Sequence, residues 1–223
     1  MLFTYFLIPL LFLFSPEKEK APPGTVLVGK YYVDYQEMTY LNWLEFQFSA
    51  TRTKFANYED IKPKGNLFIN RPNERSLPLT NITYEQALMY CKWRSKVVSE
   101  IGGRKVTYRL PTEDEWLEIV GEMMRKHPKK LIKEFNKAKK SLIRPTALLT
   151  NSRTNYPTQL FYNISEMTAT EGIAMGLNNS ILEGSKWQDN LTHTFTYEEY
   201  SPFVGFRCIA DVEEKKAKKR SNP

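Results

Sequence analysis

The pattern of apolar and polar residues predicts a strand that leads directly into a helix near the middle of the chain. Val106–Leu110 alternates and is rich in β-forming side chains, and Pro111 ends the strand because it has no N–H to donate. Thr112 and Glu115 then have the spacing of a capping box, which marks a helix N-terminus. An apolar stripe with helical spacing follows, made of Trp116, Leu117, Ile119 and Val120.

Another helix is predicted nearer the N-terminus, after the β-rich opening Val26–Val33. Thr39 can cap this helix, with Asn42 as a weak partner at the third helical position. The apolar residues that fall on one face of it are Leu41, Leu44 and Phe48. Residues 63–78, which are rich in Pro, Gly and Asn, predict a loop.

A long helix is predicted after this loop. Thr83 and Gln86 form another capping box, and Gly102–Gly103 ends the helix. Its approximate apolar stripe consists of Ala87, Leu88, Cys91, Val98 and Ile101. This spacing places Cys91 on the core side together with Leu88, which suits a buried structural cysteine better than an exposed nucleophile.

A basic helix is predicted over Lys129–Lys140, because Pro128 forces any helix through this stretch to restart. Its narrow apolar face consists of Leu131, Ile132, Phe135 and Ala138. Arg125–Arg144 holds nine lysines and arginines against one glutamate, in a chain with a formal net charge of +7. Nucleic-acid binding is not expected, because no aromatic stacking platform is interleaved with the basic residues.

Two interpretations of the basic helix remain open. It is either a solvated surface helix or a surface that contacts an anionic membrane or an acidic partner. The lysines that would make such a contact are Lys129, Lys130, Lys133 and Lys137.

The length of 223 residues and the hydrophobic content of 41% suit one well-packed domain and are short for two. Met1–Phe14 is apolar apart from Thr4 and precedes the charged run Glu17–Lys20. This apolar run fits the core of a signal peptide and falls short of the ~20 residues that a membrane-spanning helix needs. We therefore expect residues 1–20 to be a leader. Export to the periplasm or cell envelope follows, with the leader either cleaved or kept as an anchor.

Four segments together resemble the formylglycine-generating enzyme (sulfatase-modifying factor) superfamily, in the family's order. They are Tyr84–Trp93, Arg109–Trp116, Asn163–Glu166 and Gly205–Cys208. The resemblance implies an irregular, loop-rich α+β domain over residues 21–211, distantly similar to C-type lectins. Within it, residues 125–144 would be a basic insertion, and residues 212–223 would form a basic tail.

The resemblance also implies a role for the chain's two cysteines, Cys91 and Cys208. Both match positions that are structural and close in space in the family, and an exported protein would join them as a disulfide. If the protein is not exported, two buried free thiols are the alternative.

The oxidase chemistry of the family is expected to be missing. The family enzyme converts a sulfatase cysteine to formylglycine with dioxygen and a copper ion that two cysteine thiolates hold. The matching interval, residues 188–204, contains no cysteine, so neither copper binding nor a catalytic residue is expected. The chain's two histidines, His127 and His193, are too far apart in the sequence to suggest the iron site of a neighbouring family branch.

A structural calcium ion is the one cofactor that the resemblance implies. Asn163–Glu166 matches a family segment that supplies oxygen ligands, with Tyr162 where glycine is usual, so Asn163 and Glu166 are the candidate ligands. The alternative is an Asn–Glu turn that is hydrogen-bonded to the backbone.

The segment Glu166–Gly176 looks most similar to family members of gliding-motility and secretion machinery that lack the catalytic cysteines. We therefore expect a non-catalytic structural or binding component of the cell envelope that acts with an envelope protein partner. The alternative is an oxidoreductase that acts on protein cysteine or a small substrate through ligands that the sequence does not reveal.

Overall fold

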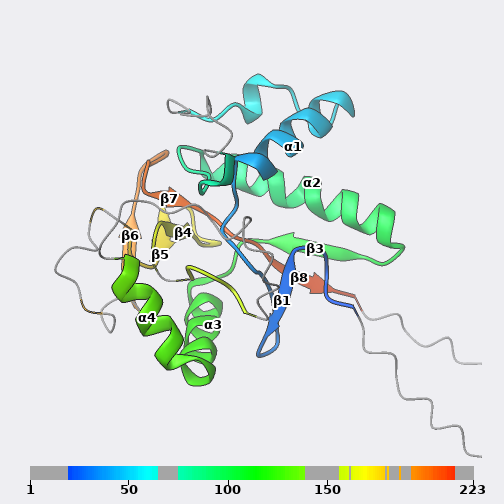
Figure 1. Cartoon of the computed structure of the whole chain (residues 1–223). Coiled ribbons are helices and arrows are strands. Elements are labelled where there is room, and N and C mark those ends of the chain that lie inside the picture. The colour runs from blue at the N-terminus through cyan, green and yellow to red at the C-terminus, as the bar shows by residue number, and fades with distance from the viewer. Residues whose placement is uncertain are drawn as a thin grey trace, which may run out of the picture.

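Four α-helices surround two small sheets in the described part of the chain (Figure 1). We describe residues 20–64, 75–138, 156–160, 162–178, 180, 186 and 192–213 of a computed structural model. The helices are α1 (Tyr40–Arg52), α2 (Tyr84–Gly102), α3 (Glu113–Lys126) and α4 (Pro128–Ala138), with a short 3-10 turn at Glu59–Ile61. The strands are β1 (Thr25–Val28), β2 (Tyr31–Asp34), β3 (Val106–Arg109), β4 (Ser165–Met167), β5 (Ile173–Met175), β6 (Thr194–Thr196), β7 (Val204–Gly205) and β8 (Ile209–Val212).

The first sheet has the order β1-β2-β8-β3 and joins both ends of the domain. β1 and β2 form a hairpin, and Gly29 makes its turn with a φ of +59°, which favours glycine. β8 lies between β2 and β3 and is antiparallel to both. The C-terminal strand therefore closes a sheet that the N-terminal residues begin.

The second sheet has the order β6-β5-β4-β7, with β4 parallel to β7 and antiparallel to β5. The segment 204–212 connects the two sheets, because β7 lies in the second sheet and β8, which begins four residues after Gly205, lies in the first. At Gly205 any Cβ would clash with the carbonyl oxygen of Leu79, so this crossing point has room only for glycine. The mixture of helices and two small sheets confirms the α+β prediction.

All three helix starts predicted from capping residues are confirmed. The reciprocal bonds of a capping box join Thr39 to Asn42, Thr83 to Gln86, and Thr112 to Glu115. α2 ends at Gly102, and the cap residue Gly103 takes the left-handed conformation with a φ of 61°. α4 restarts at Pro128, as predicted, and residues 139 and 140 lie outside the described part of the chain.

The predicted apolar face of α1 faces solvent instead of the core. Leu41 and Phe48 are exposed, and Phe48 keeps 69% of its surface accessible. The opposite face is buried because its aromatic side chains pack on α2. The ring centroid of Tyr90 lies 5.9 Å from that of Trp43 and 5.4 Å from that of Phe46. These aromatic rings bury more apolar surface than the leucines could.

The predicted apolar stripe of α2 is buried at Ala87 and Cys91, as expected, but exposed at Leu88 and Ile101. Leu88 is 40% exposed and Ile101 is 83% exposed. The sheet side of the later turns is taken by serines, whose hydroxyls accept from β3: Tyr108 N donates to Ser95 Oγ (2.8 Å) and Val106 N to Ser99 Oγ (3.0 Å). β3 is an edge strand, so these hydroxyls satisfy its free N–H groups.

α4 packs its apolar face against the domain. Leu131 and Phe135 are buried in a cluster with Trp116 and Ile119 of α3. The lysines Lys129, Lys130 and Lys133 remain exposed. Because Leu131 and Phe135 are already buried in the core, the apolar face of α4 is not free to insert into a lipid surface.

Candidate functional site

The two cysteines meet in the core between α2 and the start of β8. The Sγ atoms of Cys91 and Cys208 lie 3.3 Å apart, and both residues are buried free thiols in this structure. Burial raises the pKa of the Cys208 thiol well above its ordinary value, and the neighbouring Cys91 raises it further. The geometry brings together the pair that the sequence predicted to be joined, and the disulfide itself stays a prediction.

This thiol pair does not fit the copper ion of the oxidase chemistry. A copper site needs thiolates, and burial, which raises the pKa of Cys208, disfavours the thiolate form in this core. Cys91 is 3% exposed and Cys208 is fully buried, so a substrate cysteine has no access to them. The chain has two cysteines in all, and neither belongs to residues 188–204.

Arg207 and Glu166 form the centre of a buried polar network next to the cysteines. Arg207 Nε donates to Glu166 Oε1 over 2.7 Å, and both side chains are 1% exposed. The rest of the guanidinium donates to backbone carbonyls: Nη1 to Asp34 over 3.1 Å and Nη2 to Thr158 over 3.0 Å. The guanidinium therefore links the β2 end, the 156–160 segment and β4.

Three further side chains complete this network: Trp116, Asn163 and Glu37. Trp116 Nε1 donates to Glu166 Oε2 over 3.1 Å, and Asn163 Nδ2 donates to Glu37 Oε2 over 2.7 Å. Burial raises the pKa of Glu37 well above its ordinary value, while Arg207 and Asn163 lower it and Glu166 raises it. Burial also raises the pKa of Glu166, against the opposing effects of Arg207 and Trp116.

The candidate calcium ligands do not fit a calcium site. Each carboxylate oxygen of Glu166 already accepts from a protein donor, and the cation beside it is the guanidinium of Arg207. Asn163 directs its amide nitrogen to Glu37. Within the described residues, no group of three or more His, Cys, Asp or Glu is placed to hold a metal ion. Calcium needs six to eight oxygen ligands, and in the described part of the chain both Glu166 oxygens are already taken by Trp116 and Arg207.

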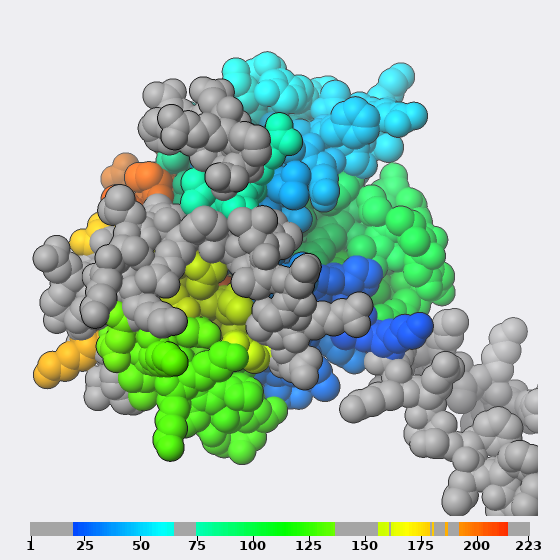
Figure 2. Space-filling model, in the orientation of Figure 1, coloured from blue at the N-terminus to red at the C-terminus, as the bar shows by residue number. Residues whose placement is uncertain are grey.

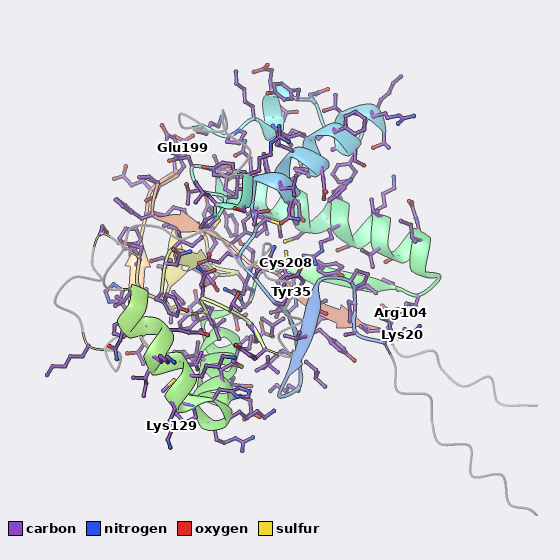
Figure 3. The ribbon with its side chains drawn as sticks, in the orientation of Figure 1. Lys20, Tyr35, Arg104, Lys129, Glu199 and Cys208 are labelled. Carbon is purple, nitrogen blue, oxygen red and sulfur yellow. The ribbon has the colours of Figure 1, made fainter. Side chains whose placement is uncertain are left out.

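A cavity of about 240 Å³ opens where the start of the domain meets α1 and α2. Figure 2 shows these segments, in blue and green, meeting on one face of the molecule. Tyr35, which lines the cavity, lies near Cys208 at the centre of Figure 3. The wall is formed by Pro23, Gly24, Asp34, Tyr35, Gln36, Glu37, Met38, Asn42, Glu45, Tyr90, Trp93, Arg94, Val97 and Val98.

An ion pair in this wall connects the cavity to the cysteines. Arg94 Nη1 donates to Asp34 Oδ2 over 2.8 Å, and its Nη2 lies 2.8 Å from Asp34 Oδ1. The same Oδ2 accepts from the backbone N–H of Cys208 over 2.8 Å. A Cβ at Gly24 would clash with the guanidinium of Arg94, so glycine there makes room for the pair. Asp34 thus holds α2 and the Cys208 backbone together.

Two residues that line the cavity each hold a buried side-chain oxygen that has no hydrogen-bond partner within the described part of the chain. They are Gln36 Oε1 and Glu37 Oε1. The residues themselves are 6% and 0% exposed. Both oxygens have almost no surface open to the cavity, so they are unpaired atoms of the interior and not groups that a molecule in the cavity can reach.

The remaining residues considered in the sequence lie apart from this cavity. His127 caps the C-terminus of α3, and its ring lies tilted against that of Tyr156, with ring centroids 5.2 Å apart. The carbonyl of His193 accepts from the backbone N–H of Gly176. Lys129 lies on α4 at the opposite end of the molecule from α1 (Figure 3). The side chain of Lys137 and residues 1–19 and 187–191 lie outside the described part of the chain.

Sequence reasoning missed most of the residues that build the cavity and the network. Asp34, Gln36 and Arg94 belong to no motif that was singled out, and Arg207 entered only as a letter of Gly205–Cys208. One sequence signal could have found Arg207, namely a charged residue within an apolar stretch. Arg207 stands in a stretch that is otherwise apolar, and a charged residue there is usually paired.

The fold and these motifs define a domain of the sulfatase-modifying type. Residues 11–128, just over half of the chain, match the family described as the sulfatase-modifying factor enzyme 1-like domain. The chain belongs to this family. No curated protein matches it. The match ends before Glu166 and Arg207, but the structure ties both residues to the matched part, because Trp116 donates to Glu166 and the Asp34 carbonyl accepts from Arg207.

Proposed function

We propose that this domain is a non-catalytic binding component of the cell envelope, of the kind that serves gliding motility or protein secretion. The observation that carries the non-catalytic part is the position of the cysteines. The chain has two, and both are buried in the core 3.3 Å apart. No cysteine is left for residues 188–204, where the family oxidase holds its copper ion.

The envelope part of the proposal rests on the leader-like residues 1–20 and on the resemblance of Glu166–Gly176 to motility and secretion proteins. In the described residues, no helix is long and apolar enough to cross a membrane. Localisation is tested by fractionating cells that make the full chain with an epitope tag at its C-terminus. We expect the protein in the periplasmic or envelope fraction, and recovery from the cytosol would contradict this part of the proposal.

The non-catalytic part is tested by a turnover assay. The protein is loaded with copper and incubated in air with a sulfatase-derived cysteine peptide, and a hydrazine reagent traps any aldehyde. A family enzyme with both copper-binding cysteines serves as the positive control. We expect no aldehyde from this chain. A trapped aldehyde would refute the proposal and favour the oxidoreductase alternative.

The binding part requires a partner. We propose an envelope protein, which purification of the tagged full chain from the envelope fraction should recover. The partner should also be found when Cys91 and Cys208 are both changed to Ser, because binding needs no thiol chemistry. If a folded C91S/C208S variant lost the partner, the result would contradict thiol-independent binding and favour the oxidoreductase alternative.

A further inference from the structure

We propose that Asp34 positions the buried cysteine pair and thereby sets its thiol–disulfide equilibrium. Asp34 contacts both segments that carry a cysteine, namely the segment that leads into β8, with Cys208, and helix α2, with Cys91. The proposal does not depend on the binding function above. It makes this part of the core a redox-sensitive device that fastens the end of β2 to α2 and to the C-terminal strand.

Asp34 fixes the main chain of Cys208 from two directions. Its backbone N–H donates to the carbonyl oxygen of Cys208 over 2.9 Å, and its Oδ2 accepts from the backbone N–H of Cys208 over 2.8 Å. Asp34 is 3% exposed and Cys208 is fully buried, so water does not compete for these bonds. A hydrogen bond from a backbone N–H to a carboxylate is about twice as strong as one between neutral groups. One residue at the end of β2 therefore determines where Cys208 lies.

The same carboxylate holds α2 through Arg94. Arg94 follows Cys91 by three residues, which places both side chains on one side of the helix. Its guanidinium meets Asp34 with both arms, Nη1 at 2.8 Å from Oδ2 and Nη2 at 2.8 Å from Oδ1. The guanidinium also lies 4.0 Å from the ring centroid of Tyr108, and Nη2 donates to the carbonyl of Pro23 over 2.8 Å. A side chain with this many fixed contacts ties the helix that carries Cys91 to Asp34.

The ion pair acts on the sulfur atoms through position and not through charge. Burial is the main cause that raises the pKa of the Cys208 thiol, and the charges of Asp34 and Arg94 shift this pKa in opposite directions. The geometric effect has no such cancellation, because both residues draw α2 and Cys208 together. The sulfur atoms of Cys91 and Cys208 consequently lie 3.3 Å apart as free thiols, with no covalent bond between them.

Oxidation of this pair needs little further ordering. Two S–H bonds break and one S–S bond forms, and the two electrons and two protons pass to an external disulfide, which is reduced to two thiols. Groups that are already held side by side react as if they were at high concentration. The domain should therefore form the disulfide even in a strongly reducing mixture. It should also keep its fold when the disulfide is reduced, because the ion pair holds the two segments in both states.

The test is the redox equilibrium of the full chain in anaerobic mixtures of reduced and oxidised dithiothreitol. N-ethylmaleimide traps the free thiols at equilibrium, and mass spectrometry measures the fraction of dithiol. Asp34→Asn keeps the size of the side chain and loses the charge that pairs with Arg94. We expect D34N to shift the equilibrium toward the dithiol by roughly tenfold or more, the effect of losing a hydrogen bond to a charged group. A wild-type equilibrium in D34N would overturn the proposal.

Variants of Arg94 test the α2 side and decide the matter if D34N does not fold. Arg94→Gln removes the charge and the paired donors, so it should shift the equilibrium in the same direction as D34N. Arg94→Lys keeps the charge but offers one ammonium group in place of two parallel donors, so it should lie between wild type and R94Q. If R94Q has the wild-type equilibrium, the proposal is wrong.

Two controls separate positioning from general stability. Asp211→Asn makes the same chemical change three residues after Cys208, at a carboxylate that pairs with Arg109 at the surface, and should not move the equilibrium. Phe135→Leu loosens the core under α4 and should lower the urea midpoint without moving the redox equilibrium. A shift in F135L as large as that in D34N would show that the equilibrium only follows overall stability, which would overturn the proposal.

Reduced wild type tests whether the ion pair holds the segments without the bond. Near-ultraviolet circular dichroism of the reduced protein should keep the aromatic signals of the packed core. Loss of these signals on reduction would show that the bond itself holds α2 to Cys208 and would contradict the role of Asp34. None of these outcomes bears on the non-catalytic assignment, because the aldehyde assay decides it separately.

Discussion

Arg207 and Glu166 form an ion pair in the interior of the domain, with Arg207 Nη2 2.5 Å from Glu166 Oε1 and both side chains 1% exposed. Three backbone or indole groups from other segments complete the pair: the carbonyls of Asp34 and Thr158 accept from Arg207, and Trp116 Nε1 donates to Glu166. The two charges are thus desolvated together and satisfied together. This is the arrangement in which a buried ion pair is tolerated, and in which removing one partner is costly.

Arg207→Met should destabilise the domain by about 3–5 kcal/mol, because it leaves Glu166 and the two carbonyls without their donor. Changing both residues, R207M with E166M, should cost less than the sum of the single changes. Urea unfolding of the two single variants and the double variant measures this coupling. Arg109→Met is the comparison, since Arg109 pairs with Glu115 and Asp211 at the surface and should cost much less. Additive single effects would contradict the coupling.

The cysteine pair should be joined by a disulfide in exported material. Peptide mapping without reduction should then find the peptides of Cys91 and Cys208 linked. In the chain-entropy model, a link across 117 residues stabilises by about 4–5 kcal/mol, so reduction should lower the urea midpoint markedly. The C91S/C208S variant should be insensitive to reductant. Free alkylatable thiols at both positions would contradict the disulfide and weaken the case for export.

Glu37 should make the domain less stable as the pH rises. Its pKa is raised in the folded state by burial, so the folded state holds a proton that the unfolded state has released. This contribution to stability is complete below the ordinary glutamate pKa of 4.5 and is lost as the pH rises toward the raised value. Glu37→Gln should remove this dependence. Urea unfolding at a series of pH values checks it, and an identical slope in wild type and E37Q would contradict it.

The lysines of α4 should bind anionic vesicles by charge alone. Lys129, Lys130 and Lys133 are exposed, whereas Leu131 and Phe135 are buried in the core and unavailable for insertion. Each lysine near an anionic bilayer contributes about 1 kcal/mol, and salt screens it. The protein should therefore sediment with phosphatidylserine vesicles at low salt and be released at high salt.

The control for this surface is a pair of exposed lysines on another helix. Changing Lys129, Lys130, Lys133 and Lys137 to Gln should abolish sedimentation while circular dichroism stays unchanged. Changing Lys92 and Lys96 of α2 to Gln should reduce it much less. If wild type ignores anionic vesicles even at low salt, α4 is a solvated face or a protein-docking surface.

The sequence by itself determined the features that depend on neighbours along the chain. Thr83 and Thr112 predict helix starts because the side chain that completes each capping box lies three residues away. Pro128 forces the helix to restart because it has no N–H to donate and its ring clashes with the preceding turn. The absence of cysteine from residues 188–204 is read directly from the sequence.

Only the tertiary structure decided which faces are buried and which distant residues meet. Ile101 is exposed because Ser95 and Ser99 take the sheet side of the later turns of α2, where their hydroxyls accept from an edge strand, and that edge exists only after β8 has paired with β3. Glu166 was expected to face calcium and instead faces Arg207, 41 positions along the chain. Such pairings follow from how the sheets pack, and side-chain burial is a property of the packed domain, so local sequence signals could not reveal them.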